Sequence, residues 1–198
     1  MTHLRSADWE VHSIPSHGEA RRLIRTWHYS KSSPNTSTYR HGLYRADAIL
    51  HGDAHGCALW IPPTRGAAEH LVGEHWGGVL SLSRLVVDPD LPTNGASFLL
   101  GRSMRLIDRD RWPVLVTYAD RALGHSGAIY RATNWTYHGE VAATAGDVWI
   151  DESGRRNGRK RGRFTYTRAE MEARGYTPAP SLPKIRFVLD PCGLIRSR

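Results

Sequence analysis

Cysteine is scarce in this chain of 198 residues, and the two that occur, Cys57 and Cys192, lie far apart with no pairing framework. A disulfide-stapled secreted domain is therefore not expected, and both thiols should be reduced in a cytoplasmic protein. The first ten residues lack the apolar core of a secretory signal. No stretch approaches the about 18 uncharged apolar residues of a membrane span, so we expect no contact with membranes.

Acidic residues are also in deficit. The chain has 19 Asp and Glu against 27 Lys and Arg, which gives a net charge of +8. A basic protein of this kind commonly binds a polyanion, most often nucleic acid. The basic residues gather in the segment 151–163, which is too charged and too glycine-broken to be a core element. We expect a surface segment there that contacts DNA phosphates through Arg155, Arg156, Arg159, Lys160 and Arg161.

The hydrophobic fraction, 40%, is enough for one compact domain over residues 1–198. Strands are predicted at Trp9–Ile14, Tyr39–Tyr44, Ala48–Leu50, Cys57–Ile61, Leu80–Val87, Val114–Tyr118, Trp135–Val141, Phe164–Tyr166 and Ile185–Leu189. Helices are predicted from a capping box at Ser16 and Glu19 to Trp27, from an Asn94 cap to Ile107, at Ser126–Thr133 and at Arg168–Arg174. Residues 64–78 read as a surface excursion with one helical turn at Ala67–Leu71.

The turn Asp88–Ser97 joins a predicted strand to a helix N-terminus. Such a turn favours an anion, because the first backbone N–H groups of the helix have no partner within it. Gly95 and Ala96 would let a phosphate come close, and the Ser97 hydroxyl could donate to it. We assign donor binding to this turn and the strand before it, through Val86, Thr93, Asn94, Gly95, Ala96 and Ser97. The structural alternative is an ordinary connection that binds nothing.

Asp120 ends a buried strand, where ligand-facing residues commonly lie in α/β sheets. It offers acid/base chemistry close to His125, Ser126 and Tyr130, which we expect to converge on one rim. Asp120 could instead cap the turn, and Tyr130 could be a core aromatic. Arg84 lies between apolar neighbours, so it is either functional or at the solvent edge of the face formed by Leu80, Leu82 and Val86.

Several motifs together resemble a known family. Strand, phosphate turn, helix, strand and the run AIYRATNW are similar to the GNAT N-acyltransferases. The more specific resemblance is to the bacteriophage Mom DNA-modification family, and it rests on these motifs: Trp27-His28-Tyr29-Ser30, Leu82-Ser83-Arg84-Leu85, Tyr118-Ala119-Asp120, Gly124-His125-Ser126-Gly127-Ala128-Ile129-Tyr130 and Lys184-Ile185-Arg186-Phe187.

This resemblance implies an α/β fold of the α+β type, with a central mixed, mostly antiparallel sheet flanked by helices. It implies an enzyme that converts adenine in double-stranded DNA to N6-(carbamoylmethyl)adenine and so shields phage DNA from host restriction. The family's functional residues fall on His28, Tyr29, Arg84, Ser97, Asp120 and Tyr130. Substrate contacts are expected from Ser30, Tyr118, His125 and Ser126, and a homodimer is one hypothesis for the assembly.

The turn DLPTNGAS lacks the arginine-led glycine pattern of ordinary acetyl-CoA binders, so the donor stays open between acetyl-CoA and a related acyl donor. The family product joins nitrogen to an sp3 carbon, which simple attack on a thioester does not give. Either the donor carries an activated methylene or a C–H bond is activated. Fe(II) held by His28, His125 and Asp120 is one hypothesis for the second route.

Adenine N6 is paired within the duplex, so the enzyme must reach it in the major groove or flip the base. An aromatic rim is predicted to stack on a flipped base through Tyr29, Tyr39, Tyr118 and Tyr130. Two other functions compete with DNA modification. One is a conventional GNAT that acetylates a small-molecule or protein amine, and the other is a basic DNA-binding protein on an inactive acyltransferase scaffold.

Overall fold

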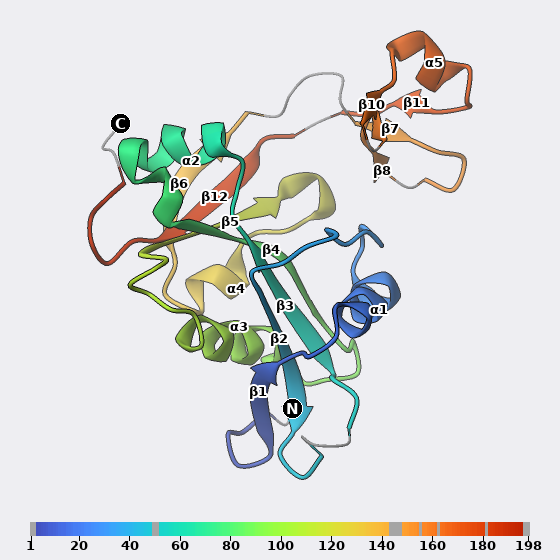
Figure 1. Cartoon of the computed structure of the whole chain (residues 1–198). Helices are drawn as coiled ribbons and strands as arrows, with labels where there is room; N and C mark the ends of the chain where they lie inside the picture. The colour runs from blue at the N-terminus through green and yellow to red at the C-terminus, as the bar shows by residue number, and fades with distance from the viewer. Residues whose placement is uncertain are drawn as a thin grey trace.

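The computed structural model describes residues 3–48, 52–142, 148–154, 156–161, 163–180 and 182–195. Within these ranges one seven-stranded sheet forms the centre of the molecule (Figure 1). Its strands, in spatial order, are β1 (Trp9–Ser13), β2 (Tyr39–Arg45), β3 (Gly56–Ile61), β4 (Val79–Val87), β5 (Val114–Asp120), β12 (Lys184–Leu189) and β6 (Thr136–Val141). Only β4 and β5 pair in parallel, which confirms the predicted mixed and mostly antiparallel sheet.

Helices cover both faces of the sheet. The helix α3 (Gly95–Arg105) and the single turn α4 (Ala128–Arg131) pack on one face. On the other face, α1 (His17–Trp27) packs against Leu59 and Val86, and α2 (Arg65–Val72) packs against Val116. A mixed α/β architecture with helices on both sides of the sheet is therefore confirmed.

The segment 64–78 is not a surface excursion. It forms the whole of α2 and a 3-10 helix at Gly73–Gly78, and Ala68, Leu71 and Val72 of α2 are buried. The prediction fails because glycine and histidine dilute the apolar pattern, although the three buried residues recur at helical spacing. Of the predicted strand Ala48–Leu50, residues 49 and 50 lie outside the described residues.

The predicted cap of α1 by Ser16 is confirmed, but neither its capping box with Glu19 nor the side-chain cap of α3 by Asn94 forms. The Ser16 hydroxyl accepts from Gly18 N, whereas the Glu19 carboxylate accepts from Ala54 N, so the two do not form a capping box. The side chain of Asn94 bonds to the backbone of Leu4 instead of capping α3. For Glu19 and Asn94, a contact distant in sequence takes the side chain away from its local partner, whereas Ser16 keeps its local cap bond.

Ser103 anchors α3 to the sheet. Its hydroxyl lies 2.8 Å from Nε1 of Trp60, which donates to it, and 2.7 Å from Nδ1 of His41. His41 is 1% exposed, and burial lowers the pKa of its imidazole to about 4. This neutral polar contact fixes α3, and with it the turn before the helix, against β2 and β3.

Between β6 and β12 the chain leaves the sheet and builds a separate small unit, the basic module (residues 148–180). Figure 1 shows its elements gathered apart from the helices that cover the sheet. They are β7 (Trp149–Ile150), β8 (Arg156–Asn157), β9 (Lys160–Arg161), β10 (Phe164–Thr165), α5 (Arg168–Glu172) and β11 (Thr177–Pro178). Buried Trp149 and Met171 give the module a core of its own. Among the residues described, no helix is long and apolar enough to span a membrane.

Candidate active site

The main sheet opens between β4 and β5. The parallel pairing joins only residues 79–81 to 114–116, after which β4 stays with β3 and β5 stays with β12. A cleft of about 460 Å³ lies at this opening. It is lined by residues 85–87 of β4, by Ala96, and by residues 124–130, which include His125, Ser126 and Tyr130. Five residues of the predicted site therefore meet in one cleft: Val86, Ala96, His125, Ser126 and Tyr130.

The N-terminus of α3 lies beside this cleft. No side chain caps the helix, because Asn94 is engaged by Leu4, and the Ser97 hydroxyl donates back to the carbonyl of Asn94 at 3.0 Å. Thr93 and Gly95 complete the turn into the helix. The first turn of α3 therefore keeps its positive end free of a side-chain acceptor, as an anion site requires.

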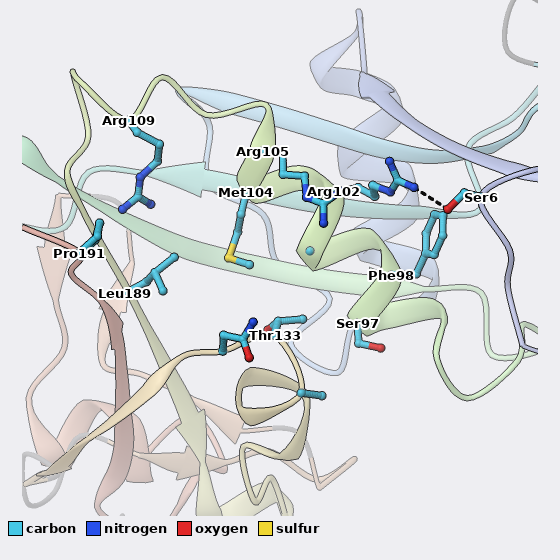
Figure 2. Close-up of a pocket in the computed structure, with 13 residues that line it drawn as sticks. Ser6, Ser97, Phe98, Arg102, Met104, Arg105, Arg109, Thr133, Leu189 and Pro191 are labelled. Carbon is cyan, nitrogen blue, oxygen red and sulfur yellow. Dashed lines mark hydrogen bonds between the residues drawn. The ribbon is translucent and has the colours of Figure 1, made fainter.

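A second cavity, of about 680 Å³, continues from Ser97 along α3. Figure 2 shows it bounded by α3, by Thr133 after α4 and by Leu189 at the end of β12. Three arginines line it: Arg102, Arg105 and Arg109. Ala96 lines the cleft and Ser97 lines this arginine groove, so the first turn of α3 borders both cavities.

Arg109 has an incomplete hydrogen-bond set. Its Nη2 donates to the carbonyl of Pro113 at 2.7 Å, while its Nη1 is buried without a partner among the described residues. Burial lowers the pKa of this guanidinium. A buried donor of this kind needs an acceptor, and an anion in the groove would supply one. The sequence analysis missed this groove, because α3 ends at Arg105 and Arg109 reaches the groove from the chain after the helix.

A cluster of aromatic rings adjoins the cleft at His125. The rings of His28 and Tyr29 are 4.2 Å apart between centroids, and those of Tyr29 and His125 are 5.3 Å apart. His28 is buried, whereas Tyr29 is 52% exposed. The loop after α1 therefore contacts the loop before α4. This contact joins the predicted motifs that contain Tyr29 and His125, which are almost a hundred residues apart in sequence.

The hydrogen bonds of His28 fix its tautomer. Its Nδ1 accepts from the backbone N–H of Ser30 at 3.1 Å and also lies 2.9 Å from the Ser30 hydroxyl. Burial, and after it the charge of Arg84, lowers the pKa of His28 to about 4. The ring is therefore neutral at pH 7 and carries its proton on Nε2. The remaining ring nitrogen, Nε2, is therefore a hydrogen-bond donor.

Arg84 ties this loop to the sheet. Its Nε donates to the carbonyl of Ser32 at 2.8 Å, and its Nη1 donates to the carbonyl of Ser83 at 2.7 Å. Burial lowers the pKa of Arg84, and the opposing influence of Tyr29 raises it. Arg84 therefore holds the loop that carries His28 and Tyr29, in addition to placing a positive charge beside them.

The predicted face of β4 is wrong beyond Ser83. Leu59 pairs with Arg84 and Trp60 with Leu82, so Ser83 is an extra residue in the strand. The bulge reverses the alternation, because Leu80 and Leu82 pack toward α3 whereas Val86 packs toward α1. Bulges commonly re-aim side chains next to functional sites.

Asp120 lies outside the lining of the cleft. One carboxylate oxygen accepts from Ala122 N at 3.1 Å, and the other lies 3.7 Å from Nζ of Lys184. The capping alternative is therefore correct in geometry. The residue also borders a small pocket of about 200 Å³ that it shares with Arg156 and Asn157 of the basic module.

Tyr130 packs as the structural alternative predicted, and it also lines the cleft. Its ring packs on buried Phe187 at 5.2 Å between centroids. Burial raises the pKa of its phenol, although a hydrogen bond with Thr117 opposes the shift, so the group stays protonated at neutral pH. The predicted helix here is only one turn, and Ile129 and Tyr130 pack inward, whereas Ala128 and Ala132 are exposed.

Two tyrosines of the predicted rim lie elsewhere. Tyr118 packs with the cluster that contains α2, next to Arg186. Tyr39 packs beside His41, at 5.7 Å between ring centroids. Neither lines the cleft. Strand alternation alone could not reveal this, because it does not say which face of the sheet opens.

The hypothesis of an Fe(II) site is not supported. Among the described residues, no three His, Cys, Asp or Glu side chains gather as a metal site. Nδ1 of His28 is taken by Ser30, and the carboxylate of Asp120 faces Ala122 and Lys184. The three proposed ligands therefore do not fit a resident metal ion.

The basic segment is partly internal to its module. Arg156 donates to the carbonyl of Pro180 at 3.0 Å, and Arg159 donates to that of Tyr166 at 3.3 Å. Lys160 and Arg163 are exposed. Arg155 and the side chain of Arg161 lie outside what the structure describes.

A sheet that opens between two parallel strands beside a helix N-terminus defines the GNAT acyltransferase fold. Three solved structures share it. They are an alanine N-acetyltransferase for a ribosomal protein from Escherichia coli (TM-score 0.51, 11% identity, 91% of this chain and 92% of that one), a spermidine N-acetyltransferase from Vibrio cholerae (0.53, 10%, 93% and 94%) and a Bacillus subtilis acetyltransferase in complex with CoA (0.52, 8%, 92% and 97%).

Within this fold the chain belongs to the Mom protein family, whose pattern matches residues 8–183. The methylcarbamoylase Mom of Escherichia phage Mu is 29% identical over 161 residues, which cover 77% of this chain and 65% of that protein. The match thus spans slightly less than two thirds of the relative. The family match includes both the cleft and the basic module.

Proposed function

We propose that this chain is a DNA-modifying transferase that converts adenine to N6-(carbamoylmethyl)adenine and so protects phage DNA from restriction. Membership of the Mom family supports the proposal, as does the name methylcarbamoylase carried by the phage Mu relative. The observation that carries it is the meeting of a donor-sized cleft with the cluster of His28, Tyr29 and His125 at the opening of the sheet.

The proposed donor is acetyl-CoA or a related acyl donor that would, when bound, present an activated methylene carbon bearing the leaving group, because attack on the thioester carbonyl would give an amide and not the N–CH2 bond of the product. The chain's own residues fit such a molecule. An apolar cleft leads to the uncapped N-terminus of α3, and an arginine groove continues from there. Arg102 and Arg105 would hold phosphate oxygens, and the unpartnered Nη1 of Arg109 would gain an acceptor.

In this proposal His28 acts as a hydrogen-bond donor. Its Nε2–H would stabilise negative charge that develops on an oxygen of the donor, because the neutral tautomer offers no free lone pair there. Tyr130, which keeps its proton, would donate from the other wall of the cleft. Asp120 would accept the proton that the adenine amine loses as the new bond to nitrogen forms.

The basic module would bring the duplex to this site. Its pocket with Asp120 places Arg156 and Asn157 at the carboxyl end of β5. Exposed Lys160 and Arg163 extend the positive surface away from the sheet. Contact with DNA phosphates is therefore the role we propose for segment 151–163, with double-stranded DNA as the partner.

A conventional acetyltransferase is the second candidate, because the cleft and the groove on either side of the α3 N-terminus would suit acetyl-CoA equally well. In that case a small-molecule or protein amine would replace DNA. The basic module gives this alternative no evident use.

Mass spectrometry of nucleosides from the DNA of an expressing host separates the two functions. We expect a new adenine derivative with the native chain and its loss with Asp120→Asn. The control is Asp47→Asn, which alters an exposed carboxylate paired with Arg45. Unmodified DNA together with acetylation of an amine by acetyl-CoA would refute DNA modification.

A further inference from the structure

Phe164 is a large apolar side chain that lies exposed on the surface of the basic module. It is 67% exposed, more than Tyr29 (52%) or Tyr137 (53%). It begins β10, and its Cα is paired with that of Arg161 in β9. This is the pair of the β9–β10 hairpin with the smallest separation in sequence, so Phe164 lies where β10 begins.

The charge around this hairpin is of one sign. Residues 154–169 contain seven Lys and Arg and no Asp or Glu. Duplex DNA carries one negative charge per roughly 1.7 Å of its axis. A segment so basic is drawn against a phosphate backbone, and Phe164 would then lie within the contact rather than in water.

Contacts with the segment that follows β10, which includes α5, also hold the hairpin in place. Tyr166 N donates to the carbonyl of Arg159 at 3.0 Å, and the guanidinium of Arg174 lies 4.3 Å from the centroid of the Tyr166 ring. A capping box formed by Thr167 and Glu170 starts α5 directly behind the strand. A side chain presented by such a frame loses little further conformational freedom on binding, so its contacts contribute more to affinity.

The module that carries Phe164 adjoins the site. Asp120 and Lys184 of the main sheet share one small pocket with Arg156 and Gly158. Only two residues separate Arg156 from Arg159, where the hairpin is anchored. A duplex lying on the hairpin would therefore also lie against the carboxyl end of β5.

We propose that Phe164 is a wedge that inserts between base pairs next to the target adenine. This inference rests on the proposed function, because the paired N6 amine is reached most directly when the base leaves the stack. An inserted apolar ring unstacks one step and kinks the duplex by roughly 20–90°. The ring occupies the space that the flipped base leaves and delays its return.

Plasmid relaxation by a topoisomerase tests the wedge without knowledge of the target sequence. With saturating protein, the native chain should untwist the bound DNA and shift the topoisomer distribution. Phe164→Ala should reduce the shift at least twofold at an occupancy matched by fluorescence anisotropy. Phe164→Trp should retain the shift. Trp76→Ala, which removes another partly exposed aromatic residue outside the module, should also retain it.

Phe164→Lys tests whether Phe164→Ala reduces the shift only because the variant binds DNA more weakly. The added cation keeps the attraction to phosphates but cannot unstack bases, so the shift should fall while binding persists. A native-sized shift with Phe164→Ala or Phe164→Lys, or no shift with the native chain, would overturn the wedge. Nucleoside mass spectrometry separates this failure from failure of the proposed function. Adenine modified normally by Phe164→Ala refutes the wedge alone, whereas unmodified DNA with a Phe164-dependent shift refutes adenine modification alone.

Discussion

Replacement of Gly127 by alanine should destabilise the chain strongly. Gly127 has a φ of +77°, which L-residues rarely adopt. A Cβ built on it would lie 2.3 Å from ring atoms of Phe187, which is fully buried. The left-handed backbone costs a non-glycine residue about 1–2 kcal/mol, and the overpacked contact adds about 1–3 kcal/mol. The expected loss in the free energy of unfolding is therefore about 2–5 kcal/mol.

Gly124 provides the matched control. Its φ is +73°, almost the same, but no atom lies within 4 Å of a Cβ placed there. Gly124→Ala should therefore cost only the backbone contribution, about 1–2 kcal/mol. The difference between the two variants isolates the contact with Phe187.

Urea unfolding followed by circular dichroism measures both variants. With a slope of about 2 kcal/mol per molar urea, the midpoint should fall by roughly 1–2.5 M for Gly127→Ala and roughly 0.5–1 M for Gly124→Ala. Phe187→Leu should make the Gly127→Ala change less costly than it is in the native background. Equal midpoints for the two glycine variants would show that the ring does not approach Gly127 so closely.

The remaining predictions concern charge. Because burial lowers the pKa of His41 from 6.5 to about 4, the unfolded chain binds a proton that the folded chain rejects. Stability should therefore be retained above pH 6.5 and fall by up to about 3 kcal/mol as the pH drops to 4. His41→Asn should flatten this fall in a urea series. Arg105→Glu should weaken CoA binding about tenfold or more in calorimetry, because it reverses one of three positive charges in the groove. Lys160→Gln with Arg163→Gln should lower the salt slope of DNA binding by about 2, since each phosphate neutralised by a cation contributes about 0.9.

One further expectation and one control accompany these charge variants. His28 also has a pKa of about 4, so part of the pH dependence should survive His41→Asn. Arg25 is exposed in the last turn of α1, and Arg25→Gln should change neither CoA binding nor the salt slope. Unchanged CoA affinity with Arg105→Glu would contradict the assignment of the groove to the donor.

The sequence was most informative where a local pattern alone determines the structure. Alternating apolar residues predicted β2, β4 and β12 nearly to the residue, because each of these strands buries at least one full face. The face of Arg84 could not be predicted, since the bulge at Ser83 depends on the partner strand β3.

The site was predicted in part for the same reason. The loop of His28 and the loop of His125 were each marked by their residue types, but their meeting depends on the Arg84 contact to Ser32. Tyr118 was misplaced because strand alternation does not identify the open face of a sheet. The arginine groove could not be predicted from helical spacing, because Arg109 joins it from beyond the end of α3.

The way in which the basic module joins the sheet has a practical consequence. It leaves after Val141 and returns before Lys184, and these two residues are paired partners on β6 and β12. The chain ends created by removing the module would already stand one hairpin turn apart. A short turn could close the sheet there, and another small unit could be grafted between the same two positions. Under the proposed function, the part that contacts DNA could then be exchanged without rebuilding the cleft.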